Sequence, residues 1–197
     1  MNAKRLMAAI LALLMVFAFA ACGGEDTAPD EDTVQQENGE VQQPEETEDT
    51  AYLEMAFGDI TITVPDIFQE PQENQGIYGA AGPDSSITVS GAMPIDIQPE
   101  DWTEDLVAAS LESLYSATYS DLTLAGFQGD VDMNGTPAVW FAFYGTNSKG
   151  VERFVQNVYL FDVDNGVEYF VNFVQSAEND VFTQDMNDTI INSITLY

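Results

Sequence analysis

The residue with the most distinctive chemistry in this chain is Cys22, the only cysteine among 197 residues. Two alanines precede it directly, and small residues of this kind are typical of an export cleavage site. Further back, Leu6 to Phe19 form an apolar stretch, and Lys4 and Arg5 give the chain a positively charged start. These three parts predict an export signal that ends at the cysteine.

The run Phe19-Ala20-Ala21-Cys22-Gly23 resembles the lipobox of bacterial lipoproteins. The usual pattern has Leu where this chain has Phe19, a mild departure because the recognition pocket needs a bulky apolar group. The resemblance implies loss of residues 1–21 and a thioether-linked diacylglycerol on Cys22. It also implies that the processed chain lies outside the cytoplasm, held on the cell membrane by its lipid.

A retained membrane helix and an ordinary buried thiol are the two structural alternatives. A spanning helix needs about 20 apolar residues, and the run over 6–21 ends after roughly 16. Gly23, Gly24, Glu25 and Asp26 follow the cysteine, and such residues bury nothing. The lipid attachment site therefore remains the favoured interpretation of Cys22.

Charge sets strong limits on the partners of the chain, whose formal net charge is −30. All 34 acidic residues follow position 21, and only Lys149 and Arg153 are basic there, so the processed chain has a net charge of −32. Nucleic-acid binding is excluded, because it draws on dense Lys and Arg. The acidity favours solvation or adaptation to salt, and a cationic envelope or secreted protein is the other interpretation.

The chain contains no histidine. This removes the commonest general base, the usual metal ligand and every triad built on histidine. Once Cys22 is acylated, no thiol remains for disulfides. We therefore assign no catalytic residue, no metal site and no cofactor from the sequence.

Residues 130–135 match the first half of an EF-hand calcium loop. Asp130, Asp132 and Asn134 stand at ligand spacing before Gly135, but the position that needs a bidentate Glu holds Phe141. The same residues form an alternating strand that ends in a hairpin turn, which is the favoured interpretation. A second, weaker cation site could use Asp162, Asp164 and Glu168, although Asp and Asn are also common in turns for backbone reasons.

Paired carboxyl groups also raise the possibility of a small hydrolase. Such a site needs one carboxyl with a raised pKa in a groove lined by aromatic rings. The residues available for it are Glu152, Glu168, Trp140, Tyr144 and Tyr159. Aromatic residues at period two are more often core, so a non-catalytic protein is favoured.

The composition divides the chain into three parts: an export signal over 1–21, a tether over 22–50 and one domain over 51–197. The tether is acidic, has no basic residue and almost no bulky apolar one, which predicts disorder. From Ala51 onward aromatic and β-branched residues recur. A single core is expected there, because a chain of about 150 residues buries about two thirds of its surface.

Alternation and turn residues predict a series of strands in the domain. The expected strands cover 52–57, 60–64, 77–81, 86–92, 123–133, 138–146, 151–161 and 167–175. Residues 66–76 are predicted to be a loop. Asn134-Gly135 and Asn165-Gly166 predict tight hairpins, and these force antiparallel pairing.

Two helices are expected, over 100–119 and over 180–192. Thr103 is a good N-cap for the first helix, and Leu111 and Tyr115 belong to its apolar face. In the strand over 123–133, Ala125, Phe127, Val131 and Met133 are predicted to share a face. In the strand over 167–175, the residues predicted to share a face are Val167, Tyr169, Val171 and Phe173. The expected fold class is α+β, a twisted antiparallel sheet with helices packed on it.

This order of elements resembles the PsbP-like fold over residues 52–197. The likeness rests on a strand that ends at Pro65, the run Asn134-Gly135-Thr136-Pro137-Ala138 before an aromatic strand, and a closing helix with Ile190, Ile191 and Ser193. The family includes an extrinsic photosystem subunit and a nuclear-import cofactor. The resemblance implies a binding or assembly module without catalysis, and it carries no site residue over to this chain.

The sequence as a whole predicts a membrane-anchored, extracytoplasmic, non-catalytic lipoprotein. Its domain would bind or assist another envelope or secreted component. The alternatives are a low-affinity cation-binding lipoprotein and a small carboxylate-dependent hydrolase. The hydrolase predicts a concave site that holds a buried carboxyl beside aromatic rings.

Overall fold

The computed structural model describes residues 50–178 and 182–197. The predicted export signal over 1–21, Cys22 and the predicted tether up to residue 49 lie outside these residues. The two predicted boundaries, at 21 and 50, therefore stay predictions. The start of the predicted closing helix, 180–181, also lies outside the described residues.

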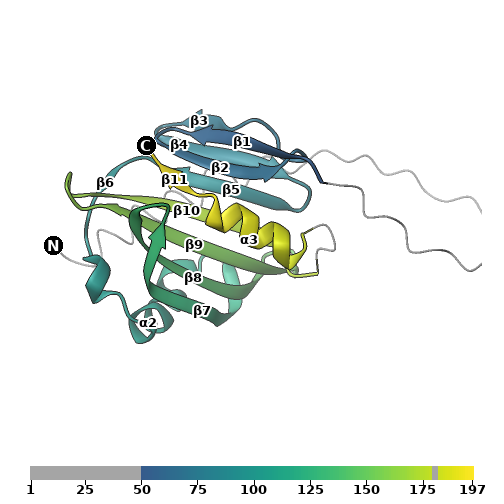
Figure 1. Cartoon of the computed structure of the whole chain (residues 1–197). Helices are drawn as coiled ribbons and strands as arrows, with labels where there is room; N and C mark the ends of the chain where they lie inside the picture. The colour runs from purple at the N-terminus through teal and green to yellow at the C-terminus, as the bar shows by residue number, and fades with distance from the viewer. Residues whose placement is uncertain (1–49, 179–181) are drawn as a thin grey trace, which may run out of the picture.

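Strands dominate the described part of the chain (Figure 1). In chain order the elements are β1 (Tyr52–Phe57), β2 (Ile60–Pro65), β3 (Gln72–Asn74), β4 (Ile77–Gly82), β5 (Ser85–Ser90), β6 (Met93–Pro94), the 3₁₀-helix η1 (Pro99–Asp101), α2 (Glu104–Tyr115), β7 (Tyr119–Met133), β8 (Thr136–Asn147), β9 (Glu152–Asp162), β10 (Val167–Ser176), α3 (Gln184–Asn192) and β11 (Thr195–Leu196).

The strands form two antiparallel sheets. The small sheet has the order β1-β2-β11, and the large sheet has the order β3-β4-β5-β10-β9-β8-β7, with β6 paired to β10. The predicted α+β class is confirmed, but the strands divide between two sheets where one was expected. The difference arises because β2 pairs with β1 and β11, whereas β3–β5 join the late hairpins through the pairing of β5 with β10.

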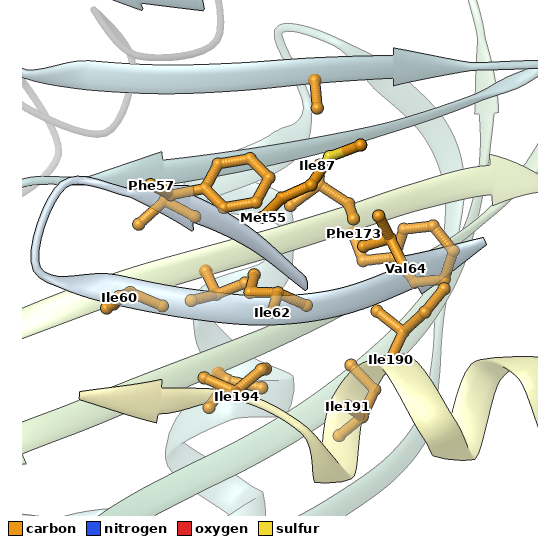
Figure 2. Packing of buried hydrophobic residues seen from close by; sticks show 14 of the residues in the cluster. Met55, Phe57, Ile60, Ile62, Val64, Ile87, Phe173, Ile190, Ile191 and Ile194 are labelled. Carbon is orange, nitrogen blue, oxygen red and sulfur yellow. The ribbon is translucent and has the colours of Figure 1, made fainter. Parts of the chain in front are cut away.

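The first core lies between the small sheet, α3 and one face of the large sheet. Figure 2 shows side chains from β1, β2, β5, β10 and α3 pointing toward one another. Ile60, Ile62 and Val64 are fully buried on β2, as is Ile87 on β5. Burying one such side chain contributes about 1.5–3 kcal/mol, so this apolar layer holds the two sheets together.

The second core lies on the opposite face of the large sheet. Alternate residues of β8 and β9 point there, and α2 covers them with Val107, Leu111 and Tyr115. In Figure 1, α2 lies beside β7 and β8, far from β3 and β4. The helix therefore covers only one half of this face.

The first predicted helix is shorter than expected. Glu100 and Asp101 belong to η1, and α2 covers only Glu104–Tyr115. The N-cap prediction is confirmed, since the Thr103 side chain accepts a hydrogen bond from the Leu106 N–H at 3.2 Å. The predicted C-terminal end was wrong because Tyr119 already belongs to β7, where it pairs with Asn147.

Strand β7 contradicts the predicted single face. Its pairing with β8 shifts register three times, and each irregularity interrupts the alternation of side chains. Phe127 packs against the second core, whereas Val131 and Met133 belong to the first core, and Ala125 is exposed. The residues 125, 127, 131 and 133 therefore do not share one face.

Both predicted hairpins are present, and the first has the predicted two-residue turn. Asn134 and Gly135 adopt φ angles of +52° and +89°, which a two-residue turn of this kind requires. The second hairpin is also present, but its turn has four residues, 163–166, and only Gly166 adopts a positive φ, +68°. The predicted common face of β10 is also confirmed, because Tyr169, Val171 and Phe173 all lie in the first core.

Asn134 ties the β7–β8 turn to the C-terminus. Its Nδ2 donates hydrogen bonds to the carbonyl of Ile194 at 2.8 Å and to that of Asn192 at 3.1 Å. We expect Asn134→Ala to lower the free energy of unfolding by about 2 kcal/mol, through lost hydrogen bonds and the strain of a positive φ. Asn134→Gly removes only the bonds and should lose about half as much. Urea denaturation of both variants measures this difference; equal losses would contradict it.

Candidate ligand-binding groove

A groove lies on the half of the second face that α2 leaves uncovered. Its floor is formed by β4 and β5, and its cavity volume is about 520 Å³. Ala80 of β4 and Ile87 of β5 point into the first core. Because side chains alternate along a strand, the residues next to them in sequence point to the opposite face, into the groove. We call it the β4–β5 groove.

The floor is hollow because its side chains are small. Gly79 and Ala81 of β4 stand opposite Thr88 and Ser86 of β5, and all four line the groove. Val174 of β10 continues the floor and also packs against the second core. The small side chains on this half of the face rise less far above the sheet than the aromatic residues of the second core. This difference in height leaves a depression, although the interior below it is packed.

Both basic residues that follow the predicted export signal line this groove. Lys149 lies in the turn between β8 and β9, where its side chain is exposed, and Arg153 lies at the start of β9. The Arg153 Nη1 donates a hydrogen bond to the main-chain oxygen of Asp84 at 2.9 Å. Within 50–178 and 182–197, neither basic side chain forms an ion pair.

Acidic side chains complete the rim. Glu70 precedes β3, Asp84 lies in the β4–β5 turn, and both are exposed. Two carboxylates and two cations thus give the lining no net charge. In a chain of net charge −30, this region differs from the rest of the surface.

A larger hollow lies between α2 and β7, with a volume of about 740 Å³. Its lining includes Glu112 and Asp121, and none of its lining residues is basic. The β4–β5 groove is the better candidate for a ligand site, because opposite charges and donors converge there on an apolar floor.

A buried carboxyl group lies elsewhere on the second face. Glu168 of β10 is 2% exposed, and it pairs with Met93 of β6. The pKa of Glu168 is raised to about 7, mainly by burial and also by the nearby Asp96 carboxylate, while the Asp96 main-chain N–H acts in the opposite direction. One oxygen of Glu168, Oε2, has no hydrogen-bond partner among the described residues.

Aromatic rings surround this region of the sheet. Tyr159 lies close enough to Glu168 for the carboxylate charge to raise the tyrosine pKa, in addition to a larger rise from burial. Trp102 packs on Tyr159 with ring centroids 4.7 Å apart. The segment that carries Asp96 and Trp102 thus lies over the carboxyl and closes it from solvent.

The structure separates the residues considered for a hydrolase. Glu168 and Tyr159 lie on the second face of the large sheet, whereas Trp140 packs against the first core. Tyr144 packs against Phe154, with ring centroids 5.0 Å apart, and Glu152 is exposed. The predicted buried carboxyl beside an aromatic ring is present, but the predicted concave site around it is not, since Glu168 is inaccessible.

The second cation site is contradicted. Asp162 accepts hydrogen bonds from Asn165 within the β9–β10 turn, whereas Glu168 is buried and cannot join a surface site. Its burial follows from the segment after β6, which brings Asp96 over the carboxyl group. No cluster of three potential metal ligands occurs in the described part of the chain.

The residues of the partial calcium loop form the predicted strand and turn. Asp130 and Asp132 belong to β7, and the Asp132 carboxylate accepts a hydrogen bond from the Gly135 N–H at 2.7 Å. Phe141 is buried in the second core. The strand interpretation of this segment is confirmed.

Sequence reasoning missed the β4–β5 groove. Two signals pointed to it: the basic residues after the export signal occur only at 149 and 153, and Gly79–Gly82 is a run of small residues. Neither signal places the two segments together. Their proximity depends on the pairing of β5 with β10 and of β10 with β9.

Comparison with known proteins identifies the architecture. No protein-family model matches the chain, and no curated protein sequence matches it. The solution structure of cyanobacterial PsbP (CyanoP) from Synechocystis sp. PCC 6803 aligns with a TM-score of 0.56 at 12% identity. The alignment covers 80% of this chain and 99% of CyanoP. The chain has a PsbP-like fold.

Two other structures align less closely. The Ran-binding protein Mog1p from Saccharomyces cerevisiae gives a TM-score of 0.48 at 10% identity, over 75% of this chain and 96% of Mog1p. LpqN from Mycobacterium tuberculosis, involved in cell envelope biogenesis, gives 0.45 at 16% identity, over 76% and 92%. At such low sequence identities, these structures show no function for this chain.

Across residues 50–178 and 182–197, neither length nor apolar character suffices for any helix to cross a bilayer.

Proposed function

We propose that this chain is a lipid-anchored, extracytoplasmic binding protein without catalytic activity. Cys22 carries the lipid, residues 22–50 form an acidic tether, and residues 51–197 form the binding domain. A small ligand occupies the β4–β5 groove. The export signal and the lipobox-like run support the anchor, and the groove supports the binding role.

The observation that carries the binding role is the contrast between the two sites on the second face. The β4–β5 groove is accessible and has donors and acceptors on a small-residue floor. Glu168, the one described carboxyl whose pKa is raised toward neutrality, is buried beneath the segment that bears Asp96. General acid catalysis needs a carboxyl group that a substrate can reach, and the buried carboxyl of Glu168 cannot be reached.

The test is mass spectrometry of the protein extracted from its own membrane in mild detergent. The intact mass should equal residues 22–197 plus a diacylglycerol, and Cys22→Ser should remain unprocessed or lack the lipid mass. Under native conditions a small molecule should remain bound to the wild type. Ala81→Leu fills the groove floor with an apolar side chain, so its bound mass should be lost.

A matched control is Ala109→Leu, which adds the same side chain at an exposed position of α2, away from the groove. It should retain both the lipid and the bound molecule. Unmodified Cys22 in the membrane fraction would refute the anchor. Equal ligand retention by Ala81→Leu and Ala109→Leu would refute the groove.

A further inference from the structure

We propose that the β4–β5 groove binds a short zwitterionic peptide, with Lys149 and Arg153 holding its C-terminal carboxylate. This inference rests on the proposed binding role of the groove, and it adds the chemical class of the ligand. The ligand main chain lies across the small residues of β4 and β5, and its amino group lies toward Glu70.

The distribution of cations is the first argument. The chain has four basic residues, and those at positions 4 and 5 belong to the predicted export signal. The other two both line one groove, although 34 acidic residues are distributed along the chain. An anionic group therefore finds a favourable partner here, and it is repelled by most of the remaining surface.

The geometry of Arg153 suits a carboxylate. Its Nη1 is held by the main-chain oxygen of Asp84 at 2.9 Å, which restricts the side chain before any ligand arrives. No other hydrogen bond joins the guanidinium to a residue within 50–178 or 182–197. A guanidinium binds a carboxylate through two parallel hydrogen bonds. Lys149, on its exposed turn, adds a second, adaptable charge.

The floor suits a peptide main chain. Gly79, Ala81 and Ser86 leave space above the sheet, and the cavity of about 520 Å³ has the size typical of small-ligand sites. Four strand spacings separate β3 from β9, roughly 19 Å at about 4.8 Å each. The Arg153 side chain spans part of this distance, and the rest accommodates three or four extended residues at about 3.3 Å each.

The overall charge argues for a zwitterion over a simple anion. A molecule with several negative charges is repelled by the field of the chain before it reaches the groove. A peptide with free termini carries no net charge, and its amino group can pair with Glu70 while its carboxylate pairs with the basic residues. The neutral sum of charges around the groove matches such a ligand.

The test is a calorimetric titration of residues 22–197 carrying Cys22→Ser, at low ionic strength. The probes are tetra-alanine with free termini, its C-terminal amide and its N-acetylated form. We expect the free peptide to bind, and the amide to bind at least tenfold more weakly. The affinity of the acetylated form should fall by a smaller factor than that of the amide, because Glu70 is exposed and solvent screens its charge.

Variants separate a specific clamp from the field of the whole chain. Arg153→Gln should weaken the free peptide at least tenfold and leave the affinity of the amide unchanged. Ala109→Glu changes the net charge by the same amount on the exposed face of α2, and it should change neither affinity. Should Arg153→Gln fail to fold, Lys149→Gln, on its exposed turn, makes the same comparison.

Three results would overturn the inference: no binding of tetra-alanine at millimolar concentration, equal binding of the acid and the amide, or equal losses in Arg153→Gln and Ala109→Glu. These results concern the ligand class alone. Lipid attachment and retention of some other molecule by the groove are decided separately, by the mass spectrometry described above.

Discussion

Raising the pH from 5 to 8.5 is expected to lower the free energy of unfolding of residues 22–197 by about 2 kcal/mol through Glu168 alone. The carboxyl is 2% exposed, and burial is the largest cause that raises its pKa from 4.5 to about 7. The folded state therefore favours the protonated form. The expected loss is smaller than the free energy that corresponds to the whole pKa shift, because solvent screens part of the Asp96 repulsion.

The sign follows from the proton balance. Between pH 4.5 and 7 the folded chain holds a proton on Glu168 that the unfolded chain has released. The stabilisation is complete below the unfolded pKa and is lost as the pH rises through the folded one. Above pH 7 the folded chain contains a buried carboxylate beside Asp96, so the segment over it should loosen.

Glu168→Gln isolates this effect from the general repulsion within an acidic chain. Its free energy of unfolding should match that of the wild type near pH 5 and exceed it by about 2 kcal/mol at pH 8.5. Glu152→Gln, an exposed glutamate of β9, serves as the matched control and should follow the wild type at both pH values. Identical pH profiles for Glu168→Gln and wild type, in urea denaturation followed by fluorescence, would contradict the assignment.

Truncation of Phe173 is expected to cost about 3–5 kcal/mol of the free energy of unfolding. This β10 residue is 1% exposed in the first core (Figure 2), and its ring lies 6.4 Å from that of Phe68 and 5.7 Å from that of Phe182. Phe173→Ala removes the aromatic contacts and leaves a cavity where the large sheet, α3 and the β2–β3 connection meet. Since domains of this size are stable by about 5–15 kcal/mol, the variant should be close to unfolding at 37 °C.

Two variants calibrate this expectation. Phe173→Leu keeps most of the volume and should lose about 1.5 kcal/mol. Val163→Ala, at a turn position that is 54% exposed, should stay within about 0.5 kcal/mol of the wild type. Chemical denaturation orders the three variants, and a loss below 1 kcal/mol for Phe173→Ala would show that this core collapses around the cavity.

Short-range patterns predicted most of the elements correctly. The hairpins follow from turn residues that accept positive φ, at Asn134, Gly135 and Gly166, and the face of β10 follows from strict alternation. These predictions succeed because each depends on neighbouring residues alone. The N-cap at Thr103 succeeds for the same reason.

Predictions failed where pairing between distant strands overrides a local pattern. In β7, the register shifts against β8 move Val131 and Met133 to the core opposite Phe127. The spacing of apolar residues predicted a helix that continues to Tyr119, but Tyr119 belongs to β7 and pairs with β8. The short strands β3 and β11 have no strong pattern and form because β4 and β2 offer free edges.

The candidate site illustrates the same limit. Composition alone shows that Lys149 and Arg153 are rare cations in an acidic chain, yet they stand about 70 positions from Gly79 and Ala81 in the sequence. Only the order β4-β5-β10-β9 brings them to one groove. Glu168 is similar, since nothing local distinguishes it from the exposed glutamates, and the distant segment that carries Asp96 is what buries it.

The sequence by itself determined the export signal pattern, the strand and turn positions, the absence of histidine and the scarcity of cations, because each is a property of residue types or of near neighbours. The tertiary structure alone decided which carboxyl is buried, which face of β7 is apolar at each point and which residues line the groove. Those properties depend on strand order and burial, and contacts between distant segments determine both.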